Sequence, residues 1–393
     1  MILEMSKKAD YYLNPIRKFF VRIFERICFK RKVLEKSAVF VSNPDFCDNS
    51  YPAFLEMQKL GYKCLWVLNY KYSKKVARGL NVKYIINKKN MRNMYILSSY
   101  KYFFYSHSLP YMYKKNDQYI YNCWHGSPFK KYHGVLLNNK ENNHFFVPPS
   151  KESLTIYHEI YPEQIDISKS LPYRHFRTDF FLDYSYLDEK NKVVDFFKLK
   201  QYKKVALCCL TWIRDKEENG KRNNLLGYEL TKGDYEKLNN SLNDSQTLLI
   251  IKPHPGQVID DLNYSNIVAI SAKTMAENNL QVYALIALSD ILFTDYSSIL
   301  FDFCLLDKPV GHIIHDWDYF TNNSNEQFIY DNPEDVMYGT KIHTLDELIS
   351  FINNPNQNNE ELRNKINSIY NDDYELKESS TLKFLREVLH EKV

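Results

Sequence analysis

Residues 289–310 read SDILFTDYSSILFDFCLLDKPV, and this stretch decides the fold. The apolar run at 290–294 predicts a strand, residues 298–306 predict a helix, and the run that begins at Val310 predicts the next strand. The polar junction holds Ser297 and Ser298 at the helix start, where free backbone N–H groups and the helix dipole favour a bound anion. Capping alone needs one polar residue, whereas four of the five at 294–298 are polar, so we expect a phosphate site here.

The same alternation extends in both directions along the chain. Strand signals precede the junction at 36–42, 64–68, 81–86, 101–105, 119–122, 204–210, 247–251 and 267–271, with helical segments between several of them. Alternating strands and helices predict an α/β protein with parallel sheets. We expect two α/β halves around a central cleft, with ligands at the carboxyl ends of the strands. The predicted division is a segment at 1–34 and two domains at 35–190 and 191–393, the second including the terminal helices.

Three further strand ends carry polar clusters. The stretch 122–134, NCWHGSPFKKYHG, contains a candidate general base, His125, with a small residue for a tight turn, a hydroxyl and two cations (Gly126, Ser127, Lys130 and Lys131). The stretch 252–255, KPHP, places Lys252 and His254 after an apolar strand, as a phosphate site or a rigid turn. The stretch 211–215, TWIRD, contributes Arg214. One helical turn beyond Ser298, Asp302 is expected to hydrogen-bond ligand hydroxyls.

Composition excludes several classes of protein. Of 393 residues, 44% are hydrophobic and 25% charged, which argues against a disordered chain. A net charge of +4 from 52 basic and 48 acidic residues does not predict a nucleic-acid binder. Seven cysteines without a CxxC pair favour a reduced protein over a disulfide scaffold or zinc module, and we expect no metal. The sequence shows neither a P-loop nor GxGxxG, and no pattern in it predicts an oligomeric state.

The N-terminal segment departs from this charge balance. Residues 14–32, NPIRKFFVRIFERICFKRK, carry seven basic residues and one acidic residue, with apolar residues at helical spacing. A basic face opposite Phe and Ile predicts a helix that lies on an anionic membrane surface. The expected contact residues are Phe19, Phe20, Arg22, Ile23, Phe24 and Arg26. The alternative is a helix packed on the domain with a solvated basic face. We expect neither a membrane-spanning helix nor a signal peptide.

These motifs together resemble the CDP-glycerol glycerophosphotransferase family, whose members build teichoic acids and related capsule polymers. The resemblance is carried by WHGSPFKK at 124–131 and by the stretch at 289–310, and more weakly by KPHP, TWIRD, RTDFFL at 177–182 and DFCDNSY at 45–51. Three positions depart from the family pattern: Leu210 replaces a proline, Ile213 is an apparent insertion, and Phe176 stands where proline is usual.

The resemblance implies a GT-B fold, in which two Rossmann-like domains face a cleft. It implies that His125 is the catalytic base and that His254 contacts the donor phosphates. The expected donor phosphate site adds Lys252, Arg214, Thr294, Ser297 and Ser298. Asp295 and Asp302 are expected near the donor polyol or nucleotide, and the expected acceptor side comprises Asp45, Asn49, Gly126, Ser127, Lys130 and Lys131.

The same resemblance implies the partners and the location. The donor is CDP-glycerol or a related CDP-polyol, the acceptor is a lipid-linked saccharide, and no cofactor is required. The protein is expected at the cytoplasmic face of the membrane, peripherally bound. Two alternatives share the fold: a glycosyltransferase that uses a nucleotide sugar, and a CDP-ribitol transferase. A non-catalytic membrane scaffold is a further alternative, although it would not need His125 and His254.

Overall fold

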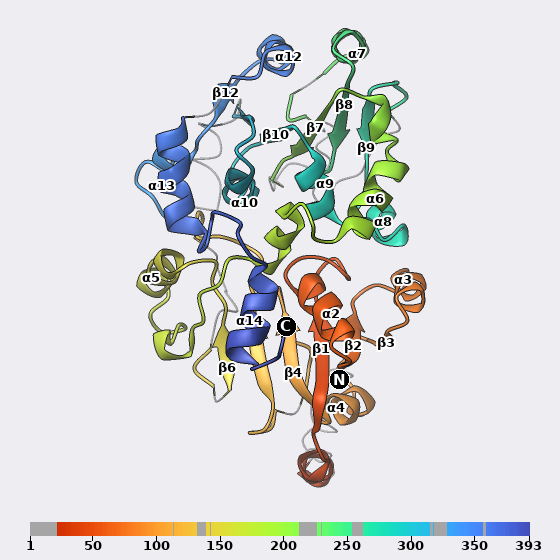
Figure 1. Cartoon of the computed structure of the whole chain (residues 1–393), viewed down its shortest axis with the longest axis vertical. Coiled ribbons are helices and arrows are strands. Elements are labelled where there is room, and N and C mark those ends of the chain that lie inside the picture. Colours follow the sequence, from red (N-terminus) through yellow and green to blue (C-terminus); the bar gives the residue numbers. More distant parts are fainter. Residues whose placement is uncertain are drawn as a thin grey trace, which may run out of the picture.

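The computed structural model describes residues 22–393 except 113, 132–138, 142, 212–225, 229, 254–261, 315–316, 318–327 and 357–358. In this part of the chain the strands form two six-stranded sheets, one above the other in Figure 1. The first sheet has the order β3-β2-β1-β4-β5-β6, and the second has the order β12-β11-β10-β7-β8-β9. All neighbouring strands are parallel, and both orders are those of a Rossmann fold. The predicted α/β class and its two Rossmann-like sheets are confirmed.

The strands are short and mostly buried, as parallel strands covered by helices on both faces must be. The eight-residue β1 buries its last five residues, and β8 buries all five. The first sheet contains β1 (Leu34–Val41), β2 (Lys63–Leu68), β3 (Lys83–Ile86), β4 (Tyr100–Tyr105), β5 (Tyr119–Asn122) and β6 (His144–Phe146). The second contains β7 (Lys204–Cys209), β8 (Thr247–Ile251), β9 (Ile267–Ala269), β10 (Ile291–Thr294), β11 (Val310–Ile313) and β12 (Thr340–Ile342).

Helices connect the strands and cover the sheets (Figure 1). Those of the first half are α2 (Ser50–Lys59), α3 (Lys74–Gly79), α4 (Met91–Leu97), α5 (Lys151–Ile160), η1 (Ile167–Lys169) and η2 (Phe176–Phe181). Next come α6 (Leu187–Phe196), η3 (Leu199–Gln201), α7 (Lys232–Asp244), α8 (Ala272–Glu277), α9 (Val282–Leu288), α10 (Ile299–Phe303) and η4 (Cys304–Leu306). The last are η5 (Pro333–Val336), α12 (Leu345–Asn353), α13 (Glu360–Tyr370) and α14 (Ser380–Val388).

The last helix, α14, packs on the first half of the chain. The Phe384 ring lies 5.2 Å from the Tyr121 ring and 6.0 Å from the Phe104 ring, both in the first sheet. The chain therefore crosses between the halves twice, once after η2 and again between α13 and α14 (Figure 1). The predicted second domain, 191–393, includes α14, although this helix returns to the first half. The division at residue 190 stays a prediction.

The two crossings are tied together at Asp179. Its carboxylate accepts hydrogen bonds from Ser379 Oγ at 2.6 Å and from the backbone N–H groups of Ser380 at 2.8 Å and Thr381 at 2.9 Å. Arg174, fully buried, donates to Asp179 at 3.1 Å and to the Asp373 carbonyl at 2.7 Å. The start of α14 is thus fixed to η2, the element from which the first crossing leaves.

Residues 22–30 are helical and precede β1. Ile23 and Ile27 are 39% and 50% exposed, so this part of the predicted apolar stripe does not pack on the domain. Phe29, which was not part of the predicted stripe, is 58% exposed. Arg22 and Arg26 are exposed and Phe24 is half-buried. Phe19 and Phe20 lie outside the described residues. Within the described chain, no helix has the length and hydropathy needed to cross a bilayer.

Candidate active site between the two sheets

The carboxyl ends of strands from both sheets meet in the middle of the molecule. Between them lies a cavity of about 80 Å³. Its lining from the first half is the loop after β1 (Pro44, Asp45, Phe46 and Cys47), and its lining from the second half includes Lys252, which follows β8. Gln281 Nε2 donates to the Phe46 carbonyl at 2.9 Å across this junction. The strand ends therefore enclose a site between the halves, as expected for sheets of this order.

His125 stands two residues beyond Cys123, in the loop that leaves β5. Its Nδ1 lies 2.8 Å from the Ser106 carbonyl oxygen. A carbonyl can only accept a hydrogen bond, so Nδ1 carries the proton and Nε2 of the neutral ring keeps its lone pair. Burial lowers the pKa of His125 below its ordinary value, which keeps the imidazole neutral at pH 7. This is the protonation state that a general base requires.

Buried polar side chains hold the His125 loop from both sides. Asn49 Nδ2 donates to the Cys123 and Trp124 carbonyls, each at 2.6 Å. Tyr157 Oη donates to the Gly126 carbonyl at 2.7 Å. These bonds fix the backbone of the loop before and after the imidazole. The predicted acceptor-side residue Asn49 is thus a structural support of the base.

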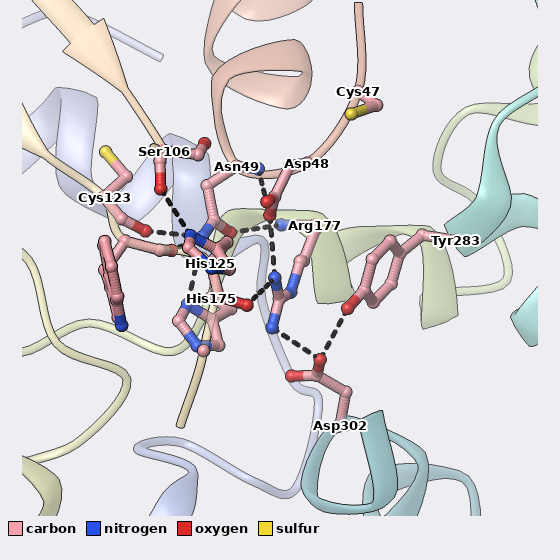
Figure 2. A network of polar contacts seen from close by, with 12 residues as sticks. Cys47, Asp48, Asn49, Ser106, Cys123, His125, His175, Arg177, Tyr283 and Asp302 are labelled. Atoms are coloured by element: carbon pink, nitrogen blue, oxygen red, sulfur yellow. Dashed lines mark hydrogen bonds and ion pairs between the residues drawn. The ribbon is translucent and has the colours of Figure 1, made fainter. Parts of the chain in front are cut away.

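Arg177 links the two halves next to this loop (Figure 2). Nη1 donates to Asp48 Oδ1 at 2.8 Å and to the His125 carbonyl at 2.6 Å, both in the first half. Nη2 donates to Asp302 Oδ2 at 2.8 Å, on α10 of the second half. Tyr283 Oη also donates to Asp302 Oδ2 at 2.6 Å. A single guanidinium therefore contacts the loop after β1, the backbone of the base and the opposite domain.

The pKa values of the two carboxyl groups in this network, Asp48 and Asp302, are shifted in opposite directions. Burial would raise the pKa of Asp48, but the charge of Arg177 and the hydrogen bond from its guanidinium outweigh burial and lower the pKa. Burial raises the pKa of Asp302 despite Arg177 and the Tyr283 hydroxyl. Asp302 Oδ1 is buried and has no hydrogen-bond partner among the described residues. The expected ligand contact of Asp302 stays a prediction, because the structure shows Oδ2 in the interdomain ion pair.

The predicted donor-side residues other than Asp302 divide into four groups. His254 and Arg214 lie outside the described residues. The side chains of Thr294 and Asp295 form hydrogen bonds with the backbone. Thr294 Oγ1 donates to the Cys209 carbonyl at 3.0 Å, and Asp295 accepts from Thr211 N at 2.7 Å. Ser297 and Ser298 are half-buried, and Ser298 makes no side-chain cap to α10. Lys252 faces the cavity described above.

The remaining acceptor-side residues are also placed. Ser127 is buried, and its hydroxyl has no hydrogen-bond partner among the described residues. Lys130 is buried beside Phe328, whereas Lys131 is exposed. Asp45 accepts hydrogen bonds from the backbone N–H groups of Asn69 at 2.8 Å and Tyr70 at 3.0 Å, and burial raises its pKa. Asp45 thus shapes the loop after β1. In the described part of the chain, no group of three His, Cys, Asp or Glu could hold a metal ion.

Sequence reasoning missed the residues at the centre of the network. Arg177 and Asp48 belong to short blocks noted in the sequence, but neither was assigned to the site. His107 was also missed; its ring is stacked on that of His125, with centroids 3.8 Å apart and planes 2° apart. A signal was present, because His107 follows the apolar strand β4 at the same sheet edge as His125. Tyr283, inside α9, gave no such signal.

The structure is an α/β protein of two Rossmann-like sheets, with the neutral imidazole of His125 near their junction. Residues 23–382 match the family model described as CDP-Glycerol:Poly(glycerophosphate) glycerophosphotransferase, and the chain belongs to that family. It is therefore a glycerophosphotransferase-class enzyme, as its motifs predicted.

Curated relatives and solved structures agree with this membership. A teichoic acid poly(glycerol phosphate) polymerase of Bacillus spizizenii is 26% identical over 75% of this chain and 75% of its own length. A protein of the same description from Staphylococcus epidermidis is 26% identical over 81% of this chain, which spans 48% of that protein. A structure of the wall teichoic acid polymerase TagF superposes with a TM-score of 0.73 at 19% identity, over 98% of this chain and 97% of the other. The last likeness concerns the fold.

Proposed function

We propose that this protein transfers glycerol phosphate from CDP-glycerol to a hydroxyl group of a membrane-linked acceptor during teichoic acid or capsule polymer synthesis. The single observation that carries the proposal is the protonation state of His125. It is a neutral imidazole whose Nδ1–H is held by the Ser106 carbonyl, in a chain that belongs to the glycerophosphotransferase family. The polymerase relatives support glycerol phosphate as the transferred group.

The proposed reaction is a direct phosphoryl displacement. His125 Nε2 takes the proton of the acceptor hydroxyl, and the oxygen attacks the phosphorus that bears glycerol. The new P–O bond forms as the bond to CMP breaks, and CMP leaves with the electron pair. Positioned bases of this kind contribute typically about 10²–10⁴-fold. The rest of the catalysis is positioning and charge stabilisation, which we assign to Lys252, His254, Arg214, Ser297 and Ser298.

CMP release tests the proposal. The protein is incubated with CDP-glycerol, with and without a lipid-linked disaccharide or a short poly(glycerol phosphate), and CMP is measured by chromatography. We expect release that depends on the acceptor, and the length of the product separates a single transfer from polymerisation. Absence of CMP with every acceptor, while CDP-glycerol remains intact, would overturn the assignment of the donor.

CDP-ribitol is the second candidate donor. A teichoic acid poly(ribitol-phosphate) polymerase of Bacillus spizizenii is 28% identical over 50% of this chain. The two donors are compared at equal concentration under the same assay, and a nucleotide sugar is included as a third. A higher kcat/KM for CDP-ribitol would replace glycerol by ribitol in the proposal. Transfer from the nucleotide sugar alone would favour the glycosyltransferase alternative.

The same proposal places the protein on the cytoplasmic face of the membrane as a peripheral protein. Residues 22–30 support this, since exposed apolar and basic side chains lie together on one short helix. Such a helix suits the interface of an anionic membrane. This helix leads into the amino end of β1, whereas His125 follows the carboxyl end of β5, so the acceptor chain would have to extend along the first sheet from the membrane to the active site (Figure 1).

A further inference from the structure

His107 is a second imidazole at the site, and neither the motifs nor the family match assign it a role. It lies at the carboxyl end of β4, one residue after Ser106, whose carbonyl holds His125. The two rings are parallel within 2°, with centroids 3.8 Å apart. Both rings are half-buried. His107 Nδ1 is buried and has no hydrogen-bond partner among the described residues.

The environment of His107 fixes its protonation state. Burial lowers the pKa of His107 to about 3. The ring is therefore neutral at pH 7 and carries one N–H. A buried N–H group without an acceptor is rare in folded proteins, because nothing replaces its hydrogen bond to water. The proton of His107 thus resides on Nε2, on the edge of the ring that remains exposed.

The stacked rings therefore carry complementary groups. His125 has the free lone pair on Nε2, because its Nδ1–H is used by the Ser106 carbonyl. His107 has the N–H donor on Nε2, because its Nδ1 is buried without a partner among the described residues. The proposed base thus has a ring with a hydrogen-bond donor stacked on it, with centroids 3.8 Å apart.

We propose that His107 binds the acceptor. The acceptor has a second oxygen, of a hydroxyl or a phosphate group, next to its attacking hydroxyl. The Nε2–H of His107 donates a hydrogen bond to this second oxygen. The bond orients the attacking hydroxyl toward His125. The inference rests on the proposed function for the identity of the reaction, but the contact itself concerns the acceptor alone. It makes the site selective for acceptors with two adjacent oxygens, such as the end of a polyol phosphate, over simple alcohols.

Three variants separate this role from packing. His107→Phe keeps a flat ring for the stack and removes the donor. His107→Gln restores an N–H donor without the ring, and His107→Ala removes both. Steady-state kinetics with CDP-glycerol are measured for each variant while either the donor or the poly(glycerol phosphate) acceptor is varied.

We expect His107→Phe to raise the acceptor KM by about tenfold, the effect of one lost hydrogen bond, while the donor KM stays near wild type. His107→Gln recovers part of the acceptor affinity, and His107→Ala does not. An acceptor KM of His107→Phe equal to that of wild type would overturn the inference. A lowered kcat with unchanged acceptor KM would also overturn it, because it would show that the ring only supports His125.

A binding measurement keeps this test separate from the donor assignment. Glycerol 3-phosphate, which carries adjacent oxygens, is titrated calorimetrically into wild type and His107→Phe without any nucleotide. We expect about tenfold weaker binding by the variant, and equal binding would overturn the inference. If wild type binds glycerol 3-phosphate through His107 but releases no CMP from CDP-glycerol, only the proposed donor is wrong.

Discussion

Arg177 Nη2 lies 2.8 Å from Asp302 Oδ2, and this ion pair, whose side chains are 4% and 1% exposed, joins the two halves of the protein. The same guanidinium holds Asp48 and the backbone carbonyl of the base. The Arg177 side chain therefore contacts both the second half of the protein and the backbone of His125. The arrangement explains why a residue outside the reacting groups is fully enclosed at the centre of the site.

Loss of Arg177 should destabilise the protein strongly. We expect Arg177→Met to lower the free energy of unfolding by about 3–5 kcal/mol, because Asp48 and Asp302 would stay buried without their cation. Urea denaturation measures the change. Arg386→Met is the matched control, since Arg386 pairs with Glu378 at 3.0 Å on the exposed surface and its loss should change the stability little. Equal losses in both variants would contradict a special role for Arg177.

His125→Ala should remove the base while leaving the site folded. We expect turnover to fall by about 10²–10⁴-fold, because the acceptor hydroxyl would lose its proton acceptor. Affinity for CDP-glycerol, measured by calorimetry, should change little. His343→Ala, at an exposed position remote in sequence, serves as the control. A near-normal rate of CMP release from His125→Ala would refute the assignment of the base.

The rate of transfer should decrease only at pH values below the ordinary pKa of histidine. Burial lowers the pKa of His125, so the imidazole stays neutral below the ordinary histidine value of about 6.5. We therefore expect kcat/KM to stay level as the pH decreases to 6.5 and to fall only at lower pH. The profile is recorded between pH 5 and 8 with CDP-glycerol and saturating acceptor. An acidic limb centred above pH 6.5 would argue against a buried neutral base.

Acid should also weaken the folded state. Burial lowers the pKa of His107 to about 3 and that of His144 to about 4, whereas histidines of the unfolded chain titrate near about 6.5. Below pH 6.5 the unfolded state binds more protons, so the free energy of unfolding falls as the pH drops from there toward 4. Each such histidine contributes a slope of up to about 1.4 kcal/mol per pH unit. Urea denaturation at pH 7.5, 6.5 and 5.5 measures it.

Variants show which histidine causes the dependence of the free energy of unfolding on pH. His107→Phe should flatten the slope by the share of one histidine. An identical slope in wild type and His107→Phe would mean that His107 does not titrate differently in the folded and unfolded states.

The helix at residues 22–30 should mediate membrane binding. We expect Phe29→Glu to weaken sedimentation with vesicles that contain anionic phospholipid, because it places a charge among exposed apolar and basic side chains. Added salt should weaken the binding of wild type. Ile167→Glu is the control, since Ile167 is 51% exposed elsewhere on the first half. Equal binding by Phe29→Glu and wild type would exclude this helix as the contact.

The sequence was sufficient to place residues that belong to local patterns. His125 follows an apolar strand, and this position alone predicted that it would lie at the carboxyl edge of a parallel sheet. The helix after β10 was likewise predicted from residues 298–306, which form α10 and η4. By contrast, β6 and β12 have three residues each, too few to show a periodic pattern, and α3 was missed because its six residues are mostly polar or small.

Contacts between distant segments could not be predicted in this way. Asp302 was expected to face a ligand because helical spacing places it near Ser298, but its partner Arg177 lies 125 positions away. Asp45 and Asn49 were expected on the acceptor side, which stays a prediction. Their hydrogen bonds join loops that are distant in the sequence. Which polar groups meet across the junction depends on how the sheets pack, and no local pattern encodes that packing.

The bonds at Asp179 bring together the two connections between the halves. Asp179 accepts hydrogen bonds from residues 379–381, while Arg174 binds the carbonyls of Asp373 and Glu378. The connection after η2 and the connection before α14 are therefore fixed at one place on the first half. Arg177, which pairs with Asp302 of the second half, belongs to the same short element η2. One element of six residues thus holds both the covalent and the ionic links between the two sheets.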